Sequence, residues 1–312
     1  MSIICPVCSG DKVRLEQAYK ASSKMLTGRH IYSCSSCDIG FVHPLPDDKE
    51  WFDYNASYFD SAHGGVNRAA ITVAFNKAVA KIRLMHLQEK LLQSAVQPKR
   101  VLEIGPGEGY FAAAFQLVFP EVEYFAVESD RSVHGALLSN GVHILDDLDA
   151  SGQGTEFDAV IISHVLEHTL GPVVSLHAMT AGLRKGGVLF IEVPCLDYAY
   201  KPIHEPHVMF FSKPALEFTI GAAGFDDMCV TYHGDTIADI RRFDLVRRIF
   251  VKLSLVTGLP ISLFVGPSKL VIEQFNLGPL ETLAVVQTRP YARQDSQARW
   301  LRAVAVKNGE AR

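Results

Sequence analysis

The chain has 312 residues, of which 48% are hydrophobic and 21% charged, and its formal net charge is −4 at pH 7. This is the composition of an ordinary soluble globular protein, long enough for one large domain and an appendage. The small negative charge excludes a general attraction to nucleic acid or anionic lipid.

Signals for export or membrane insertion are weak. The N-terminus lacks a basic stretch followed by a long apolar run, so no secretory signal is predicted. The longest apolar run, residues 249–265, is interrupted by Lys252, Gly258 and Pro260 and is too short for a confident membrane span. We therefore expect a cytoplasmic protein with no membrane span.

Two CxxC pairs mark the beginning of the chain: Cys5 with Cys8, and Cys34 with Cys37. Four thiolates in this arrangement can surround one zinc ion tetrahedrally, and a glycine soon after each pair allows the tight turn that aims backbone N–H groups at the sulfurs. In a reducing compartment, ligands are favoured over disulfides. Residues 1–45 are predicted to be a zinc ribbon with a structural Zn²⁺; incidental thiols or a redox CxxC are the alternatives.

A connector over residues 46–98 follows the turn signal Pro44-Leu45-Pro46-Asp47-Asp48. It begins with an aromatic stretch that includes Tyr54 and Tyr58. Apolar residues at helical spacing then predict a helix over residues 66–95.

From residue 100 onward, apolar strand patterns alternate with helical ones. Strands are predicted over residues 101–104, 124–127, 142–145, 157–163, 188–193, 228–232 and 282–286, and helices over 109–118, 131–139, 172–183 and 213–223. This order predicts an α/β fold with a Rossmann-like, doubly wound sheet of seven strands over residues 99–290, with ligands at the carboxyl ends of the strands. Residues 291–312 are predicted to be a polar tail.

A helical insertion is predicted before the last strand, over about residues 236–278. Basic residues alternate with Val246, Ile249, Phe250 and Leu253, which follow the spacing i, i+3, i+4, i+7. The segment 241–253 is therefore predicted to form a basic amphipathic helix. It could serve as a lid, a dimer surface, a weak membrane-surface contact or a contact for substrate phosphates.

A glycine-rich turn lies where the first strand of the sheet ends. It reads Glu103-Ile104-Gly105-Pro106-Gly107-Glu108-Gly109, and the acid Glu128 closes the next strand. Glycines let a ligand approach the backbone closely. A carboxylate at the end of the second strand can accept hydrogen bonds from both hydroxyls of a ribose. The GxGxG spacing and the acid before it favour S-adenosylmethionine (SAM) over a dinucleotide, whose binding domain is the main competitor.

Together with Ser163-His164-Val165-Leu166-Glu167-His168 and Leu183-Arg184-Lys185-Gly186-Gly187-Val188-Leu189, this turn resembles class I SAM-dependent methyltransferases over about residues 99–290. The resemblance implies contacts of Glu103 and of the turn glycines (Gly105, Gly107 and Gly109) with the amino-acid part of SAM, and of Glu128 with its ribose. It places Asp146 or, preferably, Asp147 at the adenine and His164 near the methyl group.

The run His204-Glu205-Pro206-His207-Val208-Met209-Phe210-Phe211-Ser212 supplies histidines that can titrate near neutral pH, in a loop leaving the carboxyl end of a strand. His207 is the candidate general base; His164 and His168 are weaker catalytic candidates, as pocket or packing residues. Ser212 and Pro214 predict the start of the next helix.

This run, the CxxC pairs and the tyrosines after them resemble zinc-ribbon sugar C-methyltransferases, which act on nucleotide-linked keto-sugars. That resemblance implies His207 as the base and Tyr54 or Tyr58 as a substrate contact. His204, in the same loop as His207, is predicted to be a further substrate-binding residue. The subgroup often has an acid where this chain has Pro206.

The expected function is SAM-dependent methyl transfer to a small-molecule acceptor, most readily a nucleotide-linked sugar or related metabolite. The alternatives are an O-methyltransferase acting on another metabolite, a nucleic-acid methyltransferase using the ribbon, and a non-enzymatic binding module. Nucleic acid is not the expected partner, since an Asn-Pro-Pro-aromatic motif is absent from the sequence. The oligomeric state is left open.

Overall fold

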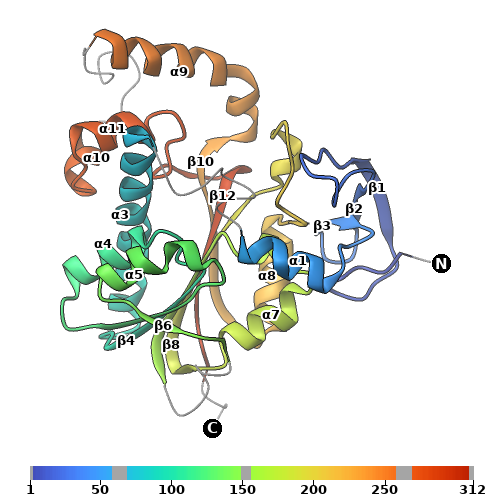
Figure 1. Cartoon of the computed structure of the whole chain (residues 1–312), viewed down its shortest axis with the longest axis horizontal. Helices are drawn as coiled ribbons and strands as arrows, with labels where there is room; N and C mark the ends of the chain where they lie inside the picture. The colour runs from blue at the N-terminus through green and yellow to red at the C-terminus, as the bar shows by residue number, and fades with distance from the viewer. Residues whose placement is uncertain (1–2, 58–68, 149–155, 258–268, 309–312) are drawn as a thin grey trace.

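The structure is a computed structural model that describes residues 3–57, 69–148, 156–257 and 269–308. Its main element is a mixed sheet in the order β11-β10-β12-β8-β7-β4-β5-β6 (Figure 1). Five neighbouring strands are parallel: β8 (Leu183–Pro194), β7 (Phe157–Ser163), β4 (Arg100–Ile104), β5 (Glu123–Val127) and β6 (His143–Leu145). The α/β class is thus confirmed.

Alternate residues of the central strands enter two different cores. Ala159 and Ile161 face α3 (Ala70–Gln93), α4 (Tyr110–Val118) and α5 (His134–Ser139), which cover one side of the sheet. Val160 and Ile162 face the other side, with α7 (Pro172–Met179) and α8 (Lys213–Ala222). Because both faces are buried, the strands are almost continuously apolar, which explains why they stood out in the sequence.

The last part of the sheet differs from the prediction. Residues 282–286, predicted as the last strand, mostly belong to helix α11 (Pro279–Val285). The final strand is β12 (Ala298–Val306), which pairs antiparallel with both β8 and β10 (Asp227–Thr236). A short apolar run does not distinguish a helix from a strand. Pro279 lies in the first turn of α11, a position where proline favours a helix.

The predicted polar tail over residues 291–312 is therefore wrong for its described part. It contains β12 and the two-residue strand β11 (Arg293–Gln294), which brings the sheet to eight strands in the described chain instead of seven. Small alanines and the charged Arg302 hid β12 in the sequence. Arg302 is nevertheless 3% exposed, because a carboxylate on β8 pairs with it inside the fold.

Between β10 and β12 the chain forms α9 (Ile237–Thr257), α10 (Lys269–Gln274) and α11. The segment 241–253 lies within α9. Ile249 and Leu253 of this helix are about half exposed, at 48% and 50%. Among the described residues, no helix is long and apolar enough to cross a membrane.

The N-terminal module forms a second sheet in the order β1-β2-β3-β9, from β1 (Val13–Ala18), β2 (His30–Cys34) and β3 (Gly40–His43). Its fourth strand, β9 (Met209–Phe210), comes from the loop that carries His207. Gly40 allows this pairing, since a Cβ there would lie 3.1 Å from the Cβ of Phe210. The module therefore packs directly on the larger domain, and its buried residues share one core with β7 and β8.

The segment between the two modules contains α1 (Asp48–Ala56), whose N-cap Asp47 accepts from the backbone N–H groups of Lys49 and Glu50. Trp51 of this helix is buried and its indole N–H donates to the carbonyl of His168. This bond fixes α1 beside the carboxyl ends of the parallel strands, where the candidate site lies.

Candidate functional site

The glycine turn after β4 has a backbone that side chains rarely allow. Gly105, Gly107 and Gly109 have φ angles of 64°, 56° and 76°. A Cβ on Gly105 would lie 2.7 Å from Cγ2 of Val165, so the turn can pass the next loop only without a side chain. The glycines thus serve the close approach of backbone to neighbours and to any ligand in the cavity.

Glu128, at the end of β5, holds this turn in place. One carboxylate oxygen accepts from the N–H of Gly107 at 3.0 Å and the other from the N–H of Asp130 at 2.9 Å. Burial raises the pKa of Glu128, and these two bonds oppose the shift. The contact of this carboxylate with a ribose remains a prediction.

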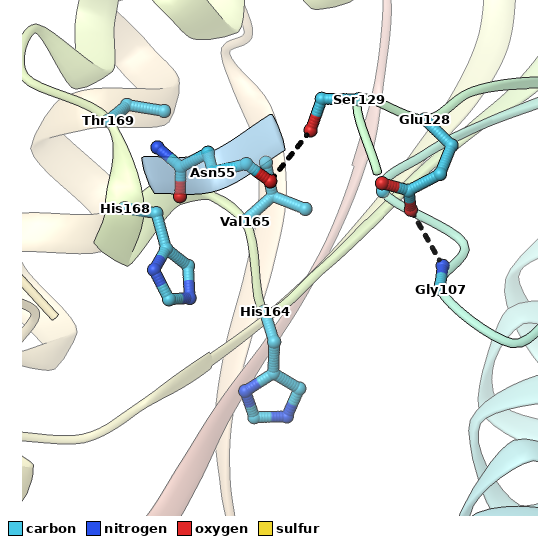
Figure 2. Close-up of a pocket in the computed structure, with 9 residues that line it drawn as sticks. Asn55, Gly107, Glu128, Ser129, His164, Val165, His168 and Thr169 are labelled. Atoms are coloured by element: carbon cyan, nitrogen blue, oxygen red, sulfur yellow. Dashed lines mark hydrogen bonds between the residues drawn. The ribbon is translucent and has the colours of Figure 1, made fainter. Parts of the chain in front are cut away.

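Two cavities meet at the turn. The first has a volume of about 240 Å³ and lies between the turn with Glu128 on one side and His164 and His168 on the other (Figure 2). The second, of about 410 Å³, shares Gly105, Gly107 and His164 with the first. It continues past Glu103 to a wall formed by α3 and Trp300. Their volumes and shared wall suit a ligand that extends along both sides of the turn.

Glu103 is a buried acid in the second cavity, with 2% of its surface exposed. The Tyr124 hydroxyl donates to its Oε2 at 2.7 Å. Burial raises the pKa of Glu103 to about 7, although the hydrogen bond from Tyr124 opposes the rise. A cationic ligand group in this cavity would favour the charged form of the carboxylate.

Two predicted cofactor residues lie outside the walls of these cavities. Gly109 is the N-cap residue of α4, and a Cβ there would meet Leu137 at 2.9 Å. Asp147 and Asp146 are exposed after β6 and line neither cavity. The packing of Gly109 is sufficient to require glycine, whereas the adenine contact of Asp147 remains a prediction.

His164 is held between two carboxylates. Its Nδ1 lies 3.1 Å from Oε1 of Glu167, and its Nε2 lies 3.1 Å from Oε1 of Glu192. Burial lowers the pKa of His164, but the two hydrogen bonds outweigh burial and raise it. Since carboxylates only accept, both ring nitrogens donate and the ring is an imidazolium. His164 therefore lines the cavity as a cation, which makes it a pocket residue rather than a base.

Glu192 is the centre of this buried charge network. Besides His164, it accepts from Nε of Arg83 at 2.9 Å and from Nε of Arg302. Burial raises the pKa of Glu192, but the two guanidinium groups reverse the effect and hold it well below the ordinary value. Arg83, Glu192 and Arg302 were not predicted from the sequence, although Glu192 is a single acid inside the apolar strand at residues 188–193.

A pair of histidines lies beyond His164. The ring of His168 lines the first cavity, and the ring of His207 meets it edge-on with centroids 5.0 Å apart. Burial lowers the pKa of His168 to about 3, so this ring is neutral. The side chain of His207 is 7% exposed, which places it behind His168.

Asp197 orients His207. Its Oδ2 lies 2.7 Å from Nδ1 of His207 and 2.7 Å from Nζ of Lys201. Burial works against ionisation, but the charges of His207 and Lys201 hold the pKa of Asp197 well below its ordinary value. A charged carboxylate at Nδ1 requires the proton there, which leaves Nε2 as the accepting nitrogen when the ring is neutral.

The same region contains a group of side chains able to hold a cation. One ligand atom each of Glu167, His168 and His207 lies within 4.8 Å of the others. Glu167 is 1% exposed, and its Oε2 has no hydrogen-bond partner in the described structure. Nε2 of His207 lies 4.0 Å from Oε1 of the same carboxylate.

None of the described residues that were predicted to contact substrate lines the two cavities at the glycine turn. His204 is fully buried, with its ring nitrogens beside Gln17 Nε2 and the backbone N–H of Lys20, so the prediction that it binds substrate is wrong. The ring of Tyr54 stacks on that of Trp51 at 5.2 Å, and Tyr54 lines none of the cavities described above. Tyr58 lies outside the described residues.

The four N-terminal cysteines come together as the CxxC spacing predicts. Their sulfurs lie within 4.8 Å of one another, with 3.6 Å between Cys5 and Cys37 and 3.5 Å between Cys8 and Cys34. Backbone N–H groups of Val7 and Ser36 point at sulfurs at 3.4 Å. Ligands about 2.3 Å from one zinc ion are separated by similar distances, so this donor set fits a structural Zn²⁺.

The part of the chain that contains the glycine turn matches a known protein family. Residues 78–230 match the model of a family described as a methyltransferase domain. No curated protein matches the sequence.

Solved structures with similar folds include a SAM-dependent methyltransferase from Archaeoglobus fulgidus, with 17% identity, a TM-score of 0.46, and coverage of 80% of this chain and 98% of that one. The plantazolicin methyltransferase BpumL has 14% identity, a TM-score of 0.44, and coverage of 84% and 98%. A possible histamine N-methyltransferase from Thermotoga maritima has 15% identity, a TM-score of 0.43, and coverage of 73% and 99%.

Proposed function

Given that the chain is a SAM-dependent methyltransferase, we propose that it methylates a small-molecule acceptor, a nucleotide-linked sugar or a related metabolite, with His207 as general base. The observation that carries this proposal is the 2.7 Å contact between Asp197 and His207, one ring away from the cavity at the glycine turn. A carboxylate that fixes one nitrogen of a buried imidazole leaves the other ready to take a proton.

SAM, when bound, supplies an electrophilic methyl group on a sulfonium. Glu103, Gly105 and Gly107 would hold the amino-acid part of the cofactor, and Glu128 would hold its ribose. Methyl transfer is an in-line displacement, for which correct positioning can contribute roughly 7–11 kcal/mol. His207 would accept the acceptor's proton at Nε2, and Asp197 and Glu167 would then stabilise the imidazolium.

Two features support an acceptor contacted beside the ribbon. The ribbon packs on the loop that carries His207, through β9 and through the bond from Val42 N–H to the Val208 carbonyl at 2.9 Å. Asn55 of α1 lines the first cavity, and its carbonyl accepts from the Ser129 hydroxyl at 3.3 Å (Figure 2). Residues near the ribbon thus form one rim of the cavity.

The acceptor is tested by thermal shift with S-adenosylhomocysteine, alone and with a panel of nucleotide-linked sugars. A shift that grows with one sugar supports the proposal, and NMR of the product then locates the methyl group on carbon or oxygen. A shift with S-adenosylhomocysteine that no sugar increases would direct the search to other metabolites.

The base is tested with His207→Ala against His177→Ala, a change of an exposed histidine on α7. His207→Ala should keep affinity for S-adenosylhomocysteine while turnover falls at least tenfold, in line with the roughly 10²–10⁴-fold contribution of a general base. His177→Ala should leave both unchanged. Unchanged turnover in His207→Ala removes His207 from the mechanism.

The unpartnered Oε2 of Glu167 favours a second candidate mechanism, in which Glu167, His168 and His207 hold a divalent cation that polarises an acceptor oxygen. The two mechanisms differ in their need for added metal. Activity that depends on Mg²⁺ or Mn²⁺ in protein whose zinc content is constant would favour the cation, whereas activity unaffected by either ion would favour the base.

A further inference from the structure

A separate cavity lies on the α3 side of the sheet, near its β10 edge. Its volume is about 390 Å³, and it lies between the C-terminal half of α3 and the strands β10 and β12. None of its lining residues lines the two cavities at the glycine turn. The cavity is therefore separate from the predicted SAM site.

Among the charged side chains that line this cavity, cations outnumber carboxylates. Arg302 forms its buried wall, and Arg293 and Lys90 lie nearer the surface, against one carboxylate in the lining, Glu89. Lys90 has a loose contact with Asp227 at 3.6 Å, whose side chain is 60% exposed. The Lys90 side chain is 16% exposed, but its partner is largely in solvent and the contact is long, so the pair is weak and Lys90 remains able to contact an anion.

Two neutral histidines position Arg302. Its Nη1 lies 2.8 Å from Nδ1 of His86 and 3.3 Å from Nδ1 of His233. Burial, together with the charge of Arg302, lowers the pKa of His86 to about 3 and that of His233 to about 2. Uncharged rings accept from the guanidinium without neutralising it, so its charge continues to act on the cavity.

The cavity contains more positive charge than its own carboxylate can balance. Glu192 is the carboxylate that pairs with Arg302, but it also accepts from Arg83 and His164. A small anion would balance the remaining charge. The guanidinium and ammonium groups around the cavity are the groups with which proteins bind phosphate.

We propose that the cavity formed by Lys90, Arg293 and Arg302 is an anion-binding site for the phosphate group of a small metabolite. The Arg302–Glu192–His164 contacts connect it to the cofactor cavities. Because the site shares no lining residue with the cavities at the glycine turn, phosphate binding can be measured without methyl transfer.

Inorganic phosphate is the first probe and glucose 6-phosphate the second, each titrated calorimetrically into the full-length protein saturated with S-adenosylhomocysteine. We expect saturable binding of both if the site recognises a phosphate group. Tighter binding of glucose 6-phosphate would indicate that the rest of the cavity contacts the metabolite, and tighter binding of phosphate would indicate a site for the free ion. Absence of saturable binding of either probe would overturn the proposal.

Arg293→Gln and Lys90→Gln test the location without disturbing the buried Arg302. Each should weaken phosphate binding at least fivefold, whereas Arg100→Gln, which removes an exposed charge at the start of β4, should not. Equal weakening in all three variants would indicate nonspecific charge and would overturn the site. Equal melting temperatures would verify that the variants are folded.

Cys229 provides an independent readout, because this exposed cysteine lines the cavity. Phosphate should slow its alkylation by iodoacetamide at least fivefold, as followed by peptide mass spectrometry. The protection should be lost in Arg293→Gln. Binding of phosphate without protection of Cys229 would place the anion elsewhere and reject the proposal.

Discussion

The hydroxyl of Tyr19 donates a hydrogen bond of 2.9 Å to the backbone carbonyl of His207. Tyr19 follows β1 of the ribbon and is 5% exposed, so this bond is shielded from water. The same loop is held by the backbone bond from His204 N–H to the Lys20 carbonyl at 3.0 Å. The ribbon therefore fixes the backbone that carries the candidate base.

Tyr19→Phe should lower turnover several-fold and leave the affinity for S-adenosylhomocysteine unchanged, because it releases the His207 backbone without touching the glycine turn. Loss of one buried hydrogen bond costs about 1–3 kcal/mol. Tyr32→Phe, a change on β2 of the same ribbon, is the matched control. If both variants retain full turnover, the ribbon bond does not position His207.

Cys8→Ser should abolish zinc binding and lower both melting temperature and turnover. The sulfur of Cys8 is one of four in the cluster, and metal-binding free energy contributes to the folding of such modules. Zinc is measured by inductively coupled plasma mass spectrometry. Cys229→Ser, outside the cluster, should keep the zinc and the activity. A Cys8→Ser protein with full turnover would show that the ribbon does not support catalysis.

The affinity for S-adenosylhomocysteine should fall as pH drops below about 7. Glu103 has a pKa raised to about 7, and an ammonium group binds the charged carboxylate better than the neutral acid. Because one proton binds to Glu103, the affinity can fall at most tenfold for each pH unit. Glu103→Gln should bind more weakly and lose this dependence. A wild-type affinity that is constant between pH 6 and 8 would contradict this assignment.

The buried carboxylate of Glu103 should also lower the stability of the folded protein as the pH rises. Its folded pKa, about 7, exceeds the ordinary value of 4.5, so the buried charge destabilises the free protein above pH 4.5 and most fully above pH 7. Glu103→Gln should therefore raise the melting temperature by a few degrees at pH 8 and less at pH 5.5. The opposite trend would mean that Tyr124 or a nearby cation stabilises the charged form.

Glu128→Gln should weaken binding of S-adenosylhomocysteine at least tenfold. The substitution removes the charge expected at the ribose and replaces one of the two carboxylate oxygens, which now accept from the N–H groups of Gly107 and Asp130, with a donor. Hydrogen bonds to charged groups contribute about 1.5–3 kcal/mol. Glu123→Gln, at the exposed start of β5, is the control. Calorimetry would contradict the ribose role if the two variants bound equally well.

Glu192→Leu should be the most destabilising of these changes, by about 3–5 kcal/mol in urea unfolding, because it leaves buried cations without their partner. Arg83, His164 and Arg302 all donate to this carboxylate. Glu123→Leu should cost little, since its partner Arg100 is exposed. Comparable stabilities for the two variants would show that water compensates the network.

The sequence by itself determined the features that depend on local spacing. The glycine turn, the alternation of buried strands with helices, and the approach of Cys5, Cys8, Cys34 and Cys37 all follow from short-range rules of backbone geometry and ligand spacing. The Ser212 cap of α8 is equally local, since its hydroxyl accepts from the N–H of Ala215 three residues later.

Tertiary structure decided the rest, because charges and strands acquire their meaning from partners far along the chain. Residues 298–306 form a central strand only because β8 and β10 flank them, and Arg302 is buried there only because Glu192, 110 residues away, pairs with it. His164, His204 and His207 are alike as sequence letters. Their neighbours make the first a cation between two carboxylates, the second a buried interface ring and the third the partner of Asp197.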